Sequence, residues 1–170
     1  YCSATPTAAP TTTAAPTPAP TITTAPTSAP TTVLFTFQAY LAEDQMSVGR
    51  NRIIPYDTAV LDLGSGFDTS SGEFVVPVDG LYFFMFTVYS GSNDGGLAVQ
   101  LRVDGSNTNQ GQGIMGTDGA SYQEGNGFAY LSLTAGQAVS VSTSNMWTSG
   151  SDVASFLGSL ALTQLGGYLI

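Results

Sequence analysis

The chain has 170 residues, and twelve acidic against three basic side chains give a net charge of -9 at pH 7. This charge repels phosphate backbones and anionic lipid surfaces, so nucleic acid is excluded as an expected partner. Histidine is absent, which removes the usual general base and the commonest transition-metal ligand, and no enzymatic activity is expected. The sequence also contains no apolar run of membrane-spanning length.

Residues 1–32 consist almost entirely of Thr, Ala, Pro and Ser. The dipeptide Ala-Pro recurs with its proline at positions 10, 16, 20, 26 and 30, which gives a ten-residue period. Proline at this density disfavours helix and central strand and predicts an extended polyproline II stalk. The composition is typical of mucin-like O-glycosylated stems. The glycosylation candidates are Thr5, Thr7, Thr11, Thr12, Thr13, Thr17, Thr21, Thr23, Thr24, Thr27, Ser28, Thr31 and Thr32.

Two roles are open for this stalk. It is either a solvated spacer or a segment that neighbouring subunits and glycans hold in place, since an extended segment can pair with a sheet edge. We favour the second role. The single cysteine, Cys2, is a candidate for an intermolecular disulfide, with a free thiol as the alternative. The start at Tyr1 rather than Met favours a secreted chain after signal-peptide removal, and an incomplete sequence is the alternative.

From residue 33 onward, short apolar runs alternate with Gly, Ser, Asn and Asp. Segment 81–90 is apolar at nearly every position, which predicts a strand buried on both faces. Segment 97–105 alternates and ends in Asp-Gly, a hairpin signal. About ten such strands predict an all-β, ten-stranded jelly-roll sandwich over residues 33–170. Residues 107–127 are polar and glycine-rich, and they are expected to form a long loop suited to surface recognition.

An aromatic motif with fixed spacing lies within this domain, and Asp62 precedes most of its members. Its residues are Tyr56, Phe67, Phe74, Gly80, Tyr82, Phe84 and Phe86. The spacing resembles that of the complement 1q-like globular domain of the C1q/TNF superfamily, except that Tyr56 stands where the family pattern has Phe. The aromatic members are expected to fill the core rather than to form a site.

The resemblance implies jelly rolls that form homo-oligomers, trimers around an apolar threefold axis, in extracellular binding, signalling or structural proteins. Some similar proteins bind calcium, but Asp94 is the only carboxylate in loops 90–96 and 105–113. No cofactor is therefore expected, and calcium remains the alternative. At the C-terminus, Tyr168, Leu169 and Ile170 form an apolar tag after a Gly-Gly hinge, beyond the usual family ending, and are assembly candidates.

The favoured hypothesis is a secreted structural glycoprotein whose heads and stalks assemble into a higher-order array such as a helical filament. The alternative is a trimeric lectin-like protein that binds carbohydrate or microbial surfaces, with Tyr122 and Trp147 as candidates for stacking on sugars. A hydrolase would need a carboxylate pair, and Glu73 and Glu124 are scattered without a recognisable motif.

Overall fold

The computed structural model describes residues 34–91, 96–115, 123–147, 154–158 and 161–170. The predicted stalk, its glycosylation candidates and Cys2 therefore lie outside the described residues. Within the described ranges all regular structure is β-strand. The strands are β1 (Thr36–Tyr40), β2 (Gln45–Val48), β3 (Thr58–Leu63), β4 (Phe67–Asp68), β5 (Glu73–Val75), β6 (Gly80–Ser90), β7 (Gly96–Val103), β8 (Ser106–Met115), β9 (Gln123–Leu133), β10 (Ala138–Trp147), β11 (Ala154–Phe156) and β12 (Gln164–Leu169).

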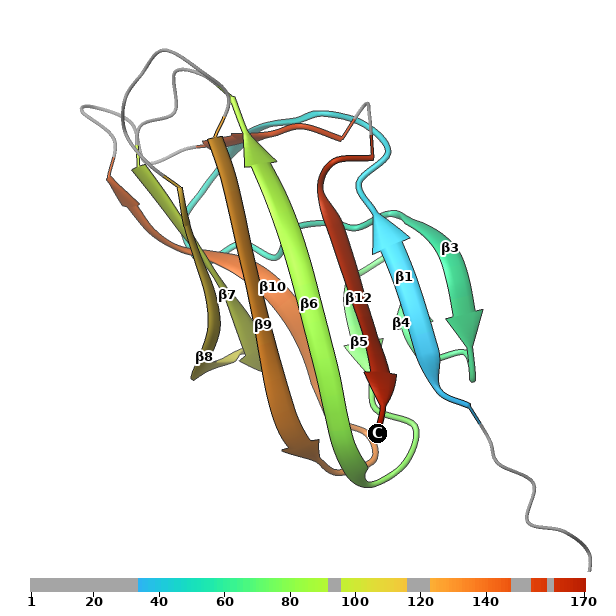
Figure 1. Cartoon of the computed structure of the whole chain (residues 1–170). Coiled ribbons are helices and arrows are strands. Elements are labelled where there is room, and N and C mark those ends of the chain that lie inside the picture. The colour runs from blue at the N-terminus through green and yellow to red at the C-terminus, as the bar shows by residue number, and fades with distance from the viewer. Residues whose placement is uncertain (1–33, 92–95, 116–122, 148–153, 159–160) are drawn as a thin grey trace, which may run out of the picture. The chain divides into compact units, whose positions relative to one another are not determined.

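The strands form two antiparallel sheets that pack face to face (Figure 1). The seven-stranded sheet has the order β2-β11-β6-β12-β1-β3, and β9 pairs with β6 along its whole length. The five-stranded sheet has the order β4-β5-β10-β7-β8. This arrangement confirms the all-β jelly-roll sandwich. The predicted strand number is close, because β4, β5 and β11 are short pieces of two or three residues.

Strand β6 shows how the sequence divides its side chains between the two faces of a sheet. Tyr82, Phe84 and Phe86 point into the sandwich and are almost fully buried. Successive strand side chains point to opposite faces, so Phe83 and Met85 point outward. Met85 is 54 % exposed, and the expectation that 81–90 is buried on both faces is therefore wrong. The apolar run is covered by its own chain on one face only.

Aromatic rings from both sheets meet in the centre of the core. Phe37 of β1 stacks on Phe67 of β4 and Phe74 of β5, with ring centroids 5.0 Å and 4.6 Å apart. Phe84 of β6 meets Phe74 edge-on at 5.8 Å. Ring pairs in offset or edge-on geometry stabilise a core beyond the effect of their burial. These contacts join the two sheets across the sandwich.

One side of the sandwich is closed by glycines. Strands β8 and β9 are edge strands of different sheets, and they approach each other closely. A Cβ atom on Gly113 would lie 3.1 Å from the backbone N and O of Asn126, and one on Gly127 would lie 2.6 Å from the Phe86 ring. Glycine is required here because the backbones touch. The long loop predicted over 107–127 is wrong, since strands cover all of it except residues 116–122, which lie outside the described residues.

The C-terminal segment is a central strand rather than a flexible tag. Gly166 and Gly167 lie within β12, which pairs with β1 on one side and with β6 on the other. The expected Gly-Gly hinge is therefore wrong. Leu169 is partly buried against the core, whereas Tyr168 and Ile170 are exposed.

The buried hydroxyl of Tyr56 generates a stability prediction. This side chain is fully buried, its Oη has no hydrogen-bond partner among the described residues, and burial raises its pKa. A buried hydroxyl without a partner costs about 1–3 kcal/mol. We therefore expect Tyr56→Phe to increase the free energy of unfolding by about 1 kcal/mol and Tm by about 4 °C, measured by thermal and denaturant unfolding.

Tyr82→Phe is the matched control for this prediction. The Tyr82 hydroxyl donates to the backbone O of Val78 at 2.8 Å, so its removal is expected to destabilise the domain by about 1 kcal/mol. A loss of stability in Tyr56→Phe as large as that in Tyr82→Phe would contradict the assignment of an unpaired hydroxyl.

Candidate functional site

The outer face of the seven-stranded sheet carries apolar side chains from four strands. The register places Tyr168 of β12 beside Phe83 of β6, and Phe83 beside Tyr130 of β9. One pair further along, Met85 of β6 lies beside Phe128 of β9. Residues two apart on a strand share a face, so these side chains form one surface. Leu61 and Leu63 of β3 and Leu81 of β6 extend it.

Phe83 is the centre of an aromatic cluster on this face. Its ring centroid lies 5.0 Å from that of Tyr130, 5.4 Å from that of Tyr168 and 6.3 Å from that of Phe128. These spacings are those of favourable ring pairs. The rings therefore support one another on the surface instead of lying as isolated exposed side chains.

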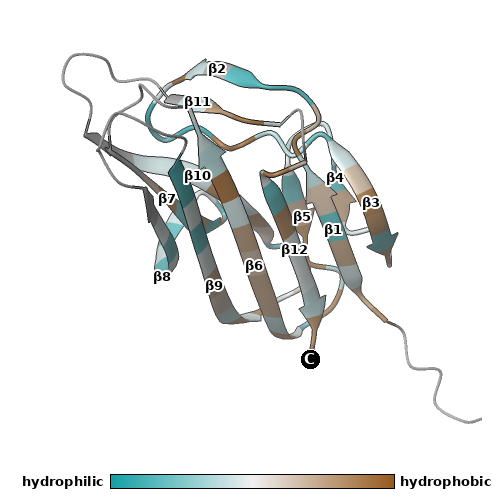
Figure 2. Cartoon of the chain, turned by 45° about the horizontal axis from the view of Figure 1, so that its top comes forward, coloured by the Kyte–Doolittle hydropathy of each residue, from teal (hydrophilic) through white to brown (hydrophobic). Residues whose placement is uncertain are grey.

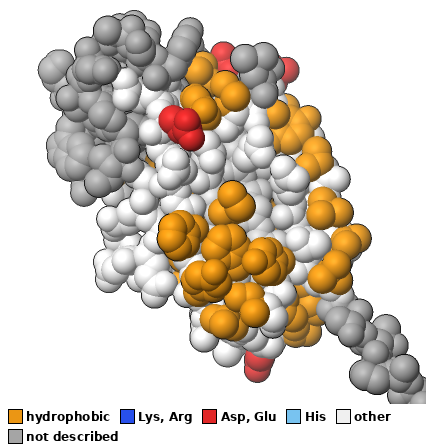
Figure 3. Space-filling view, in the orientation of Figure 1, with side chains coloured by type: hydrophobic (Ala, Val, Ile, Leu, Met, Phe, Trp, Pro, Cys, Tyr) orange, Lys and Arg blue, Asp and Glu red, His pale blue; other side chains and the backbone are white. Residues whose placement is uncertain are grey.

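Much of this apolar face is open to solvent. Phe128 is 66 % exposed, Tyr130 54 % and Tyr168 44 %. Figure 3 shows the hydrophobic side chains as one cluster over the lower part of β6, β9 and β12, with a second band along β1 and β3. Figure 2 shows that β6 itself is hydrophobic along most of its length. Contiguous apolar surface of this kind is typical of an interaction site.

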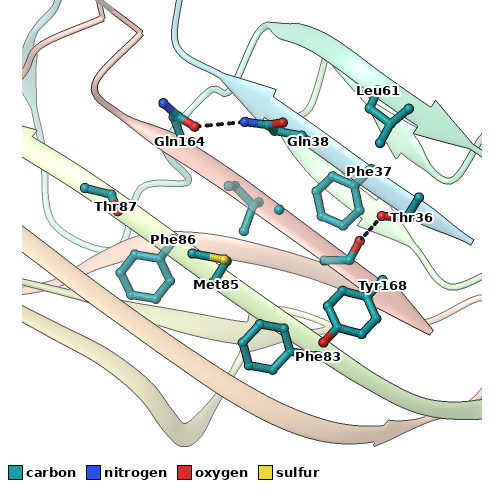
Figure 4. A pocket seen from close by; sticks show the side chains of 13 residues that line it. Thr36, Phe37, Gln38, Leu61, Phe83, Met85, Phe86, Thr87, Gln164 and Tyr168 are labelled. Carbon is teal, nitrogen blue, oxygen red and sulfur yellow. Dashed lines mark hydrogen bonds between the residues drawn. The ribbon is translucent and has the colours of Figure 1, made fainter. Parts of the chain in front are cut away.

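A hollow of about 310 Å³ lies on the face, between the aromatic cluster and β3. It forms over β12, where Gly166 carries no side chain and a Cβ atom would meet only the backbone O of Phe37, at 3.3 Å. Figure 4 shows Met85 and Phe83 on one side of it and Leu61 on the other. The hollow is wide and shallow, and apolar side chains dominate its walls.

Polar groups on the face are paired with each other. Gln38 Nε2 donates to Gln164 Oε1 at 3.0 Å, and Thr36 Oγ1 donates to the backbone O of Gly167 at 3.2 Å (Figure 4). Near the start of β9, Glu124 Oε2 accepts a hydrogen bond from Tyr89 Oη of β6 at 2.7 Å. This hydrogen bond raises the pKa of Tyr89. The side chains around Phe83 are mainly apolar and contain few hydrogen-bonding groups, which suits contact with an apolar partner.

The sequence-predicted motif residues lie elsewhere, in the interior. The six aromatic members are at most 9 % exposed, and Gly80 begins β6, where a Cβ atom would lie 2.4 Å from Leu169 Cδ1. Of the three C-terminal assembly candidates, Tyr168 belongs to the apolar face, whereas Leu169 packs toward the core and Ile170 ends the chain. In β6, the motif and the apolar face thus use alternate residues of one strand.

Within the described residues, the carboxylates considered for metal binding or hydrolysis do not come together. Asp94 and Tyr122 lie outside the described residues. Within the described ranges no three His, Cys, Asp or Glu side chains gather as metal ligands. Glu73 lies on β5 and Glu124 on β9, in different sheets. Trp147 is the last residue of β10.

Sequence reasoning did not single out Phe83, Met85, Phe128 and Tyr130. The signal was present in β6, where apolar residues occupy both alternating sets of positions. In β9, Phe128 and Tyr130 alternate with Ala129 and Leu131, and only the latter two are buried.

No helix in the described part of the chain is long and apolar enough to cross a membrane.

Comparison with known proteins agrees with this architecture. The C1q domain family profile matches residues 36–169. The globular domain of the zebrafish complement 1qA protein is similar in structure, with a TM-score of 0.59 and 17 % identity over 80 % of this chain and 97 % of that domain. No curated protein sequence gives a significant match.

Two further solved structures share the fold at lower sequence identity. Eiger TNF from S. frugiperda gives a TM-score of 0.61 at 12 % identity, over 81 % of this chain and 92 % of that one. Murine APRIL, crystallised at pH 5.0, gives 0.56 at 13 % identity, over 81 % and 99 %. The family match spans most of the chain and includes β12, so Tyr168 and Leu169 lie within the family's domain and not beyond its ending, as had been expected. The chain belongs to the C1q domain family.

Proposed function

We propose that this protein is an extracellular structural subunit that self-associates through the apolar face of its seven-stranded sheet. The jelly-roll domains (residues 33–170), which we call the heads, associate as trimers. The stalk (residues 1–32) joins these trimers into a higher-order assembly such as a filament. The observation that carries this proposal is the exposed aromatic cluster around Phe83, bordered by the hollow over Gly166. Domains of this family are typically trimeric and extracellular, which agrees with it.

The energetics favour burial of this face. Full burial of a large apolar side chain contributes about 1.5–3 kcal/mol relative to exposure. Phe128, Tyr130, Met85 and Tyr168 are each about half exposed, so an association that covers them recovers a large part of this stabilisation. The Tyr hydroxyls keep contact with water at the margin of such an interface.

The charge distribution supports the same face. The net charge of -9 opposes close approach of identical chains. The aromatic cluster at the centre of the apolar face contains no charged residue. Glu124 lies at the start of β9, several residues before Phe128 and Tyr130. Copies that meet through this face therefore keep most of their carboxylates apart.

The proposal predicts that Phe128→Asp disrupts the trimer without unfolding the head. Phe128 is 66 % exposed in the single chain, so its replacement removes few contacts within the domain. A charge in an apolar interface carries a desolvation penalty of several kcal/mol. Light scattering at micromolar concentration is expected to show a shift from trimer to monomer, with unchanged far-UV circular dichroism.

Val75→Asp is the matched control, because Val75 is 44 % exposed on β5 of the other sheet. It is expected to remain trimeric. A trimeric Phe128→Asp protein, or an equal loss of trimer in both variants, would refute the assignment of the interface.

A second prediction concerns the stalk. Deletion of residues 1–32 is expected to abolish long assemblies while leaving folded, trimeric heads. Negative-stain electron microscopy of native and truncated protein measures the assemblies, and light scattering measures the head. Long assemblies that persist after the deletion would remove the stalk from the proposal.

A further inference from the structure

Strand β3 presents an exposed apolar edge. It ends the seven-stranded sheet, and within the described residues only β1 pairs with it. Its sequence, TAVLDL, contains no Lys or Pro, and the features that limit pairing along this edge are Asp62 and the bulge at Val60. Val60 is 59 % exposed at a bulge, and Leu61 and Leu63 are also exposed. An apolar edge strand of this kind is a template for strand addition.

The sequence of the stalk contains a segment suited to this edge. Residues 21–25, TITTA, lie between Pro20 and Pro26 and contain no proline. Four of the five residues are β-branched, which favours an extended, paired strand. Ile22 is the only large aliphatic side chain between residues 3 and 32. The corresponding window in the preceding repeat, 11–15, has Thr in place of this Ile.

The composition of residues 26–34, between this window and β1, favours an extended spacer. Pro26 and Pro30 lie in the connection, and proline biases itself and the preceding residue toward extended conformations. At about 3.1 Å per residue, the nine residues 26–34 span about 28 Å in polyproline II conformation. An extended spacer of this length favours a second copy over the same chain as the partner of the window.

We propose that residues 21–25 of one copy add as a strand to the outer edge of β3 of a second copy. Ile22 then lies toward the Leu61 and Leu63 side of the sheet and extends the apolar face. Every chain carries both the donor window and the acceptor edge at different places, so the contact repeats without closing and produces a filament. This inference rests on the proposed self-assembly and identifies the partner of the stalk.

The donor is tested in the full-length chain by Thr23→Pro. Proline in the window removes a backbone N–H donor and disrupts pairing. Long assemblies are expected to be lost. Thr13→Pro is the matched control, because Thr13 holds the same position in the preceding repeat, and it is expected to keep them. Equal behaviour of the two variants, whether both assemble or neither does, would overturn the choice of window.

The acceptor is tested by Val60→Lys, since a lysine on an edge strand opposes strand addition. Val75→Lys is the control on the other sheet. Only Val60→Lys is expected to lose long assemblies. Circular dichroism and thermal unfolding of both variants establish that the heads are folded. Long assemblies formed by a folded Val60→Lys protein would overturn the assignment of β3.

A mixing experiment tests the pairing itself. The Thr23→Pro protein keeps its acceptor edge and the Val60→Lys protein keeps its donor window, so the mixture is expected to associate although neither protein does so alone. A mixture that stays dissociated would refute the pairing. An unglycosylated peptide of residues 20–26 is expected to shorten wild-type assemblies, and a peptide of residues 10–16 is the control.

The head measurement keeps this inference separate from the proposed function. Light scattering of the short species of Thr23→Pro is expected to give trimers. Monomers in that sample would refute trimer formation through the apolar face, while the filament and mixing results would still decide the strand pairing. Trimers together with failed mixing would refute the pairing alone.

Discussion

The stacking of Phe37 between Phe67 and Phe74 is the contact on which the rest of the structure depends. Phe37 belongs to the seven-stranded sheet and its two partners to the five-stranded sheet, so the stack fixes how the sheets face each other. Phe84 joins the same cluster from β6. Because side chains alternate along a strand, an inward Phe84 forces Phe83 and Met85 outward. The packing of the interior thereby determines the composition of the apolar face.

Strand β6 therefore serves two processes with one run of apolar residues. The set with Tyr82, Phe84 and Phe86 stabilises the folded chain, and the set with Phe83 and Met85 remains for association.

Carboxylates have a different role: Asp62 accepts from the backbone N–H of Gly66, and Asp104 accepts from that of Ala138. Several of the acidic side chains that produce the net charge hold turns in place rather than gathering into a site.

Much of the fold could be predicted from the spacing of aromatic residues, because ring size and strand alternation strongly restrict where Phe67, Phe74 and Phe84 can pack. The apolar outer face could not be predicted, because the sequence does not distinguish an apolar residue on the outer face of a strand from one that points into the core. Met85 is an example. Two predictions that rested on glycine residues were wrong. Gly166 and Gly167 were expected to form a hinge and the 107–127 glycines a loop, but Gly166 and Gly167 lie in β12, and the described glycines of 107–127 lie in β8 and β9. At Gly167 and Gly127 a Cβ atom would lie less than 3.0 Å from a phenylalanine ring.

The glycine contact between β8 and β9 limits how this protein can diversify. A Cβ atom on Gly127 would lie 2.6 Å from the Phe86 ring, which leaves no space for a methyl group, and one on Gly113 would contact the Asn126 backbone tightly, at 3.1 Å. Substitution of these two glycines is consequently opposed by steric contact, whatever the chemistry of the new residue. Other surfaces, such as the exposed residues of the β7–β8 turn around Asn107, carry no such restriction. New specificities of the domain are thus confined to its ends and open faces, while its closed side stays fixed.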